Sequence, residues 1–254
     1  MTTLRQPRWV AFAVFVVALM ALCILAGRWQ WHRWHDRLER NAAVEAAAAA
    51  EPSDAGSVLL VDAPLTPGAE FSKVSASGSY DLSGQVLVRN HNGRGGFEVL
   101  TPLLTDVGAA VIVDRGWLPQ STASAAEAPA VPDPPAGPVD VILRLRPAEA
   151  PAANADLAPA GQTYSIDVDA IAADLPYPVY GGYGELVEQD PAVTDDLVLP
   201  EPPPLGSGPH FFYAIQWWFF AALALVGFVL LARRESDTAP QAEAADGPTP
   251  SSVV

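Results

Sequence analysis

Residues 208–232 read GPHFFYAIQWWFFAALALVGFVLLA, and the rest of the chain is organised around this stretch. After its histidine, roughly twenty residues carry no formal charge, which is enough for one helix to cross a hydrocarbon core of ~30 Å. Gln216 is the only clearly polar side chain in the apolar part, and Arg233 and Arg234 follow directly after it ends. The stretch therefore predicts a transmembrane helix over residues 210–232.

The first turns of this predicted helix form the candidate site. His210, Tyr213 and Trp217 stand at i, i+3 and i+7, so a helix places an imidazole, a hydroxyl and an indole on one face. Histidine is a common axial ligand of haem iron, which makes His210 a candidate metal ligand. The alternative is a polar residue at the helix mouth that hydrogen-bonds to lipid headgroups.

A second apolar run, WVAFAVFVVALMALCILAG, occupies residues 9–27. The apolar core of a signal peptide is normally ~7–15 residues and ends at a cleavage site of small residues. This run is longer and continues into Arg28 and Trp29, so we predict a retained transmembrane helix. Residues 28–51 then continue as a juxtamembrane helix whose tryptophans suit the headgroup region. On it, His32 and His35 share a face, either as a metal or haem pair or as part of an interfacial polar surface.

Charge next to the second helix predicts the orientation of both. Around the first helix the charges do not favour one orientation, because arginines flank both of its ends. No Lys or Arg lies between Arg146 and Arg233, and then two arginines follow together. The positive-inside rule therefore places residues 233–254 in the cytoplasm. Two helices place residues 1–8 there as well, and everything between the helices outside.

From about residue 58 the hydrophobic period changes from helical to extended. Short runs rich in Val, Leu, Thr and aromatics are separated by Gly, Asn and Asp. Residues 52–209 therefore predict a small antiparallel β domain that forms a barrel or closed sheet. Within it, the Ala/Pro-rich residues 120–138 predict an exposed loop without a core of its own. Residues 233–254 are polar and predict a disordered tail. The fold class is an α+β membrane protein with two transmembrane helices, N-in and C-in, flanking an extracytoplasmic β domain.

Composition excludes several functions. The net charge is −15, and residues 41–209 hold 23 Asp and Glu against 6 Lys and Arg, so a nucleic-acid partner is not expected. This acidity serves either solubility or a basic partner. The single cysteine, Cys23, excludes an internal disulfide and a Cys-rich metal or haem-attachment site. No G-x-S-x-G, phosphate-loop or H-E-x-x-H motif is present, and we expect no enzymatic activity.

Arg115 stands out in this acidic domain, because it follows the apolar strand VIVD and precedes Gly116 and Trp117. One interpretation makes Arg115 a contact for an anion or a propionate. The other pairs Arg115 with an acid such as Asp114 and places Trp117 in the core of the β domain. The sequence does not decide between them.

These stretches together resemble the surfeit locus protein 1 family of membrane proteins. The end of the first helix carries G-x-W-Q-x-x-R as Gly27, Trp29, Gln30 and Arg33. The β domain carries G-x-(Y/F)-D as Gly78, Tyr80 and Asp81, a Thr-Pro-Leu segment at residues 101–103, and VIVDRGWLP at residues 111–119. The second helix opens with H-x-x-Y-A-x-Q-W as His210, Tyr213, Ala214, Gln216 and Trp217. Asp114 departs from the asparagine usual in the family and puts a charge beside Arg115.

The resemblance implies a protein that assists assembly of cytochrome c oxidase, with haem a as a transient cofactor and the oxidase catalytic subunit as partner. From their positions we predict that His210, Tyr213, Trp217 and Arg33 contact haem, with Arg28 or Arg33 reaching its propionates. Gly27, Trp29, Gln30, Arg115, Gly116, Trp117 and Gln216 are expected to be partner or structural residues. The expected location is the cell's inner (plasma) membrane, in the lipid bilayer, with contacts to other respiratory-chain subunits. The alternative is a permanent structural subunit of a respiratory oxidase with no role in haem handling.

Overall fold

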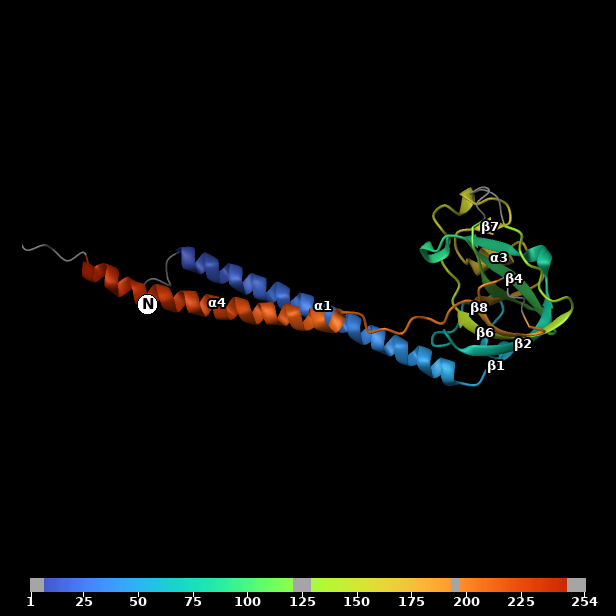
Figure 1. The fold of residues 1–254 in the computed structure, drawn as a ribbon, viewed down its shortest axis with the longest axis horizontal. Coiled ribbons are helices and arrows are strands. Elements are labelled where there is room, and N and C mark those ends of the chain that lie inside the picture. The colour runs from blue at the N-terminus through green and yellow to red at the C-terminus, as the bar shows by residue number, and fades with distance from the viewer. Residues whose placement is uncertain (1–6, 121–128, 193–196, 246–254) are drawn as a thin grey trace, which may run out of the picture. The chain divides into compact units, whose positions relative to one another are not determined.

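The computed structural model describes residues 7–120, 129–192 and 197–245 (Figure 1). The chain divides into two compact units, one formed by residues 1–41 and 205–254 and the other by residues 42–204. The first unit holds most of helix α1 (Pro7–Ala49) and helix α4 (His210–Ala245). The second unit holds all the strands and the short helices.

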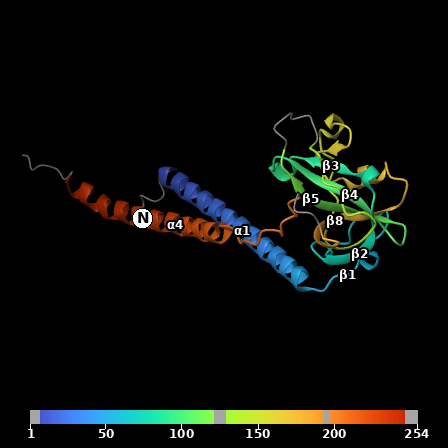
Figure 2. The same ribbon diagram turned by 45° about the vertical axis from the view of Figure 1, so that its right-hand side comes forward.

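Helices α1 and α4 lie side by side and run in opposite directions, as both ribbon views show (Figures 1 and 2). Contacts at the two ends of the pair agree with this: Arg8 bonds Glu235 at one end, and Gln30 bonds His210 at the other. Both helices are long and apolar enough to cross a membrane. The expectation of two apolar helices flanking a β domain is thus confirmed.

Small side chains allow the two helices to pack closely. Ala214 and Ala221 are buried one heptad apart in α4, and Cys23 and Gly27 are buried in α1. Residues that are three, four or seven positions apart lie on the same side of a helix. Buried small residues at this spacing are typical of a seam between two packed helices. Most of the large apolar side chains on the other faces of both helices are exposed. Cys23 therefore serves to pack the seam and does not face outward.

The β domain is a closed ring of five strands. They are β2 (Lys73–Tyr80), β6 (Pro138–Arg146), β8 (Val179–Asp190), β5 (Ala110–Leu118) and β4 (Phe97–Thr105), and β4 pairs with β2 to close the ring. The short strands β1 (Ser53–Asp54), β3 (Val86–Arg89) and β7 (Gln162–Thr163) extend the sheet beyond the ring. The predicted barrel is present, but the prediction of a wholly antiparallel sheet is wrong. Strand β8 runs parallel to β5, and two of the short pairings are also parallel.

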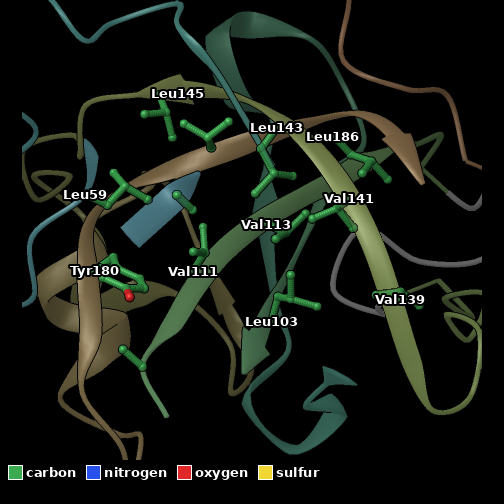
Figure 3. Packing of buried hydrophobic residues seen from close by; sticks show 13 residues of the cluster. Leu59, Leu103, Val111, Val113, Val139, Val141, Leu143, Leu145, Tyr180 and Leu186 are labelled. Carbon is green, nitrogen blue, oxygen red and sulfur yellow. The ribbon is translucent and has the colours of Figure 1, made fainter. Parts of the chain in front are cut away.

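The core of the domain lies inside this ring. Alternate residues of each strand point inward, as in any β barrel, and these positions hold aliphatic side chains (Figure 3). The labelled residues that meet there include Leu103, Val111, Val113, Val139, Val141, Leu143, Leu145 and Leu186. Gly78 lies where β2 meets β4, and a Cβ there would overlap the carbonyl oxygen of Leu104. The glycine therefore lets the ring close.

A second apolar layer covers part of the outside of the ring. Ile112 and Leu100 point outward and pack against helix α3 (Val168–Ala172) and the residues before it, such as Ile166. Strand β5 is therefore buried on both faces. The remaining short helices are α2 (Ala55–Val58), η2 (Leu82–Gly84), η3 (His91–Gly93) and η4 (Ala155–Leu157).

Two segments expected to lack structure are partly ordered. Helix α4 continues to Ala245, well beyond Arg233, where the predicted disordered tail begins; residues 246–254 lie outside the described residues. In the Ala/Pro-rich loop, residues 121–128 are not described. Residues 129–137 are described, and there Val131 packs against a small apolar cluster while the carbonyl of Pro132 accepts a hydrogen bond from Arg115. This half of the loop therefore contacts the β domain through Val131 and Pro132.

Candidate functional site

A hydrogen bond between the two long helices fixes the orientation of His210. Its Nδ1 lies 2.7 Å from Oε1 of Gln30, and both side chains are partly buried. An amide oxygen only accepts, so the proton of a neutral imidazole lies on Nδ1 and the lone pair remains on Nε2. Histidines that bind metals are commonly oriented in this way, with one nitrogen donating to an oxygen and the other left for the metal.

Several polar side chains lie on the same edge of the helix pair as this bond, and we call Gln30, Arg33, Arg37, His210 and Tyr213 the polar edge. In α1, Arg33 follows Gln30 by one turn and is exposed. In α4, Tyr213 follows His210 by one turn and is 45% exposed. Arg37 lies beside Gly208, directly before α4. The structure thus brings the predicted residues Arg33, His210 and Tyr213 to one edge.

Three other predicted helix residues occupy different surroundings. Trp217 follows His210 by two turns, is partly buried and packs edge-on against Phe220. Gln216 is exposed and points away from the seam with α1. Trp29 is 59% exposed, and its side chain also points away from the seam. Trp217 can therefore border the polar edge, whereas Gln216 and Trp29 face the surroundings of the helix pair.

The opposite edge of the pair is aromatic. Trp31 lies 5.7 Å from Trp218 and Trp34 lies 5.1 Å from Phe211, measured between ring centroids. His35 packs against both Trp31 and Trp34 in this cluster, while His32 is exposed. Neither α1 histidine is on the polar edge with His210. Among the described residues no group of three His, Cys, Asp or Glu could hold a metal ion. Both interpretations of His32 and His35 stay predictions, and the structure places His35 in the aromatic cluster.

Gly27 has a clear structural role beside the aromatic cluster. A Cβ at this position would overlap the indole ring of Trp218. The glycine thus admits the indole into the seam and sets how closely α1 and α4 approach just below the polar edge. Trp218 belongs to no site predicted from the sequence, although the heptad spacing of Ala214 and Ala221 indicates the buried face of α4.

In the β domain, Arg115 lies within one end of the ring. It is 2% exposed, donates 2.9 Å to the carbonyl of Pro132 and 3.3 Å to Oε1 of Gln85, and lies over the ring of Tyr80. Burial lowers the pKa of the guanidinium, and the charges of Tyr80 and Asp133 oppose this effect. Arg115 does not pair with Asp114, because successive residues of a strand point to opposite faces. Its partners secure the loop to the end of the ring.

Gly116 and Trp117 hold the segment that leads out of the β domain. Trp117 and Val198 exchange backbone hydrogen bonds of 2.8 and 3.0 Å. Gly116 has a φ of +133°, and a Cβ there would lie 2.7 Å from the carbonyl oxygen of Val198. The indole of Trp117 stacks 4.0 Å from the guanidinium of Arg94 and donates to the carbonyl of Gly95. Trp117 is only partly buried, so the interpretation that placed it in the core of the β domain is wrong.

The Gly-x-Tyr-Asp motif is also structural. The hydroxyl of Tyr80 donates to Oε1 of Gln189, which ties β2 to β8. Asp81 caps η2 by accepting from the amide and hydroxyl of Ser83, and it also accepts from the hydroxyl of Tyr177 at 2.7 Å. These hydrogen bonds lower the pKa of Asp81. The motif therefore stabilises the ring and contributes no group to the polar edge.

A polar cavity of about 170 Å³ on the outside of the ring was not foreseen as a site. Asp114 lies in its wall, 4% exposed, and accepts a hydrogen bond from the amide of Gly116. Burial raises the pKa of Asp114 well above its ordinary value, and Glu98 and Glu185 raise it further. His91 forms ion pairs with Glu98 and Glu149. Burial alone would lower the pKa of His91, but these bonds and charges raise it to about 10.

Comparisons with known proteins match most of the chain. A model of the SURF1 family matches residues 17–222, which include the helix seam, the polar edge and the whole β ring. Uncharacterized SURF1-like proteins from Mycobacterium bovis and from two strains of Mycobacterium tuberculosis are each 32% identical over 253 residues. The aligned region covers 97% of this chain and 91% of each relative.

Proposed function

The chain belongs to the SURF1 family, whose members generally are cytochrome oxidase assembly factors, and from this premise we propose that it assists insertion of haem a into the catalytic subunit of cytochrome c oxidase. The observation that carries the proposal is the oriented His210 on the polar edge.

The helix pair has the dimensions expected of a membrane anchor. Arg8 pairs with Glu235 at one end, and Gln30 bonds His210 at the other. Along an ideal helix Arg8 and Gln30 are about 33 Å apart, close to the ~30 Å of a hydrocarbon core. In our proposal the polar edge therefore lies at headgroup depth. The proposal puts the Arg8 end in the cytoplasm and the β domain on the outer face, and the basic pair after residue 232 supports this orientation through the positive-inside rule.

The residues of the polar edge fit the chemistry of a haem. Neutral imidazole is the form that ligates iron, and Nε2 of His210 carries the lone pair that this requires. Arg33 and Arg37 offer guanidinium groups, which bind carboxylates such as propionates in bidentate fashion. Tyr213 and Trp217 offer aromatic surface beside His210. Ligation by one histidine leaves a labile complex, which suits a protein that passes haem on to another.

Haem content of the purified protein tests this proposal. We expect His210→Ala to keep membrane insertion and abundance but to lose bound haem, when both forms are purified from cells that make haem a. The matched control is His35→Ala, which removes a histidine of α1 that lies on the aromatic edge. This variant should retain haem. Gln30→Leu should leave haem bound but alter its spectrum, because the imidazole loses its fixed orientation. Equal haem in the wild type and His210→Ala would contradict the proposal.

Recovery with the oxidase tests the alternative function. A permanent structural subunit would be recovered in constant ratio with mature oxidase. An assembly factor would be recovered only with incomplete oxidase. We expect the second pattern, because the polar edge is built to bind and release a ligand.

A further inference from the structure

Residues 197–201 join the β domain to the chain that leads to α4, and they are anchored at several points. Leu197 is buried in a small cluster with Phe97 and Leu118. Val198 exchanges two backbone hydrogen bonds with Trp117. Nη2 of Arg144 donates to the carbonyls of residues 200 and 201, at 3.2 and 2.9 Å. We call residues 197–201 the exit segment.

Three carboxyl groups meet where the exit segment is anchored. Asp114 on β5 is in register with Glu185 on β8 and with Leu100 on β4, two residues from Glu98. All three carboxyl groups line the 170 Å³ cavity, and the exit segment closes another part of its wall with residues 200 and 201. The amide of Gly116, which lies against Val198, donates to Asp114. The cluster and the anchor therefore share one site.

The cations at this site are already paired with the other two carboxylates. Glu98 pairs with His91, and Glu185 pairs with Arg144 at 2.6 Å and with Arg146 at 3.7 Å. The remaining charged or titratable groups that line the cavity are Arg94, which stacks on Trp117, and Tyr183 and Glu201. Within the described residues, no ion pair to Asp114 is present. An ionised Asp114 would thus add a buried negative charge beside two carboxylates without a cation of its own.

We infer that Asp114 is a proton-binding site that controls the anchoring of the exit segment. With the proton bound, Asp114 is neutral and the ion pairs of Glu98 and Glu185 remain undisturbed. When the proton leaves, the new charge repels Glu185 and competes with it for Arg144, the residue that holds the carbonyls of residues 200 and 201. Asp114 is only 4% exposed, so movement of the exit segment away from the cavity lets more water reach the charge and favours the ionised form. The β domain then becomes less firmly attached to the chain that enters α4.

The direction of the pH effect follows from the burial of Asp114. Its pKa is raised in the folded state, so its contribution to anchoring is complete at low pH and is lost as pH rises through the folded-state pKa. The contribution of protonated His91 to stability also falls as pH rises, but the pKa of His91 is about 10, so this contribution is lost at higher pH. Replacing Asp114 alone therefore separates its pH effect from that of His91. Asparagine is the suitable replacement, because it has the same shape and keeps an oxygen for the amide of Gly116.

Hydrogen exchange of the full-length protein in nanodiscs tests the inference. We expect protection factors of the Trp117 and Val198 amides, corrected for intrinsic exchange, to fall by up to about tenfold per pH unit as Asp114 ionises. In Asp114→Asn the protection factors of the same two amides should be independent of pH over the range in which Asp114 ionises in the wild type. The control Asp106→Asn replaces an exposed aspartate in the β4–β5 turn and should behave as the wild type.

Two results would overturn the inference: protection that does not change with pH in the wild type, or an unchanged pH dependence in Asp114→Asn. A second variant keeps the test valid if Asp114→Asn folds poorly. Glu98→Gln removes one of the two charges that raise the pKa of Asp114, so the loss of protection should move to lower pH. A midpoint that stays in place in Glu98→Gln would equally contradict the role of Asp114.

Discussion

Replacement of Gly116 by alanine tests how the β domain holds its exit segment. The φ of +133° is a backbone conformation that residues with a Cβ rarely adopt, and holding one there costs about 1–3 kcal/mol. The new Cβ would also lie 2.7 Å from the carbonyl oxygen of Val198. That oxygen cannot retreat without lengthening its bond to the amide of Trp117, which contributes about 1 kcal/mol. We expect Gly116→Ala to reduce the free energy of unfolding by about 2–4 kcal/mol.

Gly108→Ala is the matched control for this prediction. Gly108 also has a positive φ, of +86°, but a Cβ there would meet no heavy atom within 4 Å. Its cost should come from backbone strain alone, about 1 kcal/mol. Urea unfolding of the full chain in detergent, measured by pulse proteolysis, compares the two variants. If Gly116→Ala is no more destabilising than Gly108→Ala, the close contact with the exit segment does not contribute to stability.

Three further predictions follow from other contacts. Gly27→Ala should lower the thermal stability of the helix pair in detergent, because its methyl group overlaps the indole across the seam, whereas Gly227→Ala should not, since nothing lies within 4 Å there. Trp117→Ala should cost only about 1–2 kcal/mol in urea unfolding, from a hydrogen bond and the stack on Arg94, and a loss above 3 kcal/mol would place Trp117 in the core after all. The interactions that raise the pKa of His91 stabilise the fold fully below pH 6.5, and this stabilisation is lost as pH rises through about 10. The free energy of unfolding should therefore decline over that interval in the wild type and decline less in His91→Gln. Equal slopes in the two proteins would exclude His91 as the cause.

Local patterns in the sequence predicted the elements of the fold better than their pairing. The two uncharged runs are sufficient for the apolar helices, and the change of period after residue 58 is sufficient for strands. The parallel pairing of β5 with β8 could not be predicted, because those strands are some seventy residues apart and no local feature distinguishes the two directions. The heptad of Ala214 and Ala221 does mark the seam of α4.

The candidate site was predictable in part. His210 and Gln30 each belong to a recognisable motif, but their hydrogen bond joins residues 180 positions apart and depends on how the helices pair. The buried position of Arg115 and the partly exposed one of Trp117 could not be predicted from strand alternation, because the pairing of β5 with β4 is irregular between Glu98 and Leu100. Asp114 was noticed as a departure from the family pattern. Its burial beside Glu98 and Glu185 became evident only once the strand order was known.

The central claim is that His210 handles haem a on its way to the oxidase, and the haem a content of membranes tests it most directly. A strain that lacks the gene should be complemented with the wild type, His210→Ala or His35→Ala, with equal protein levels verified in the membrane. The absorption of haem a in the oxidase should be restored by the wild type and by His35→Ala, and should remain low with His210→Ala. Full restoration by His210→Ala would contradict the claim and leave His210 as a structural residue that bonds Gln30 at the helix mouth.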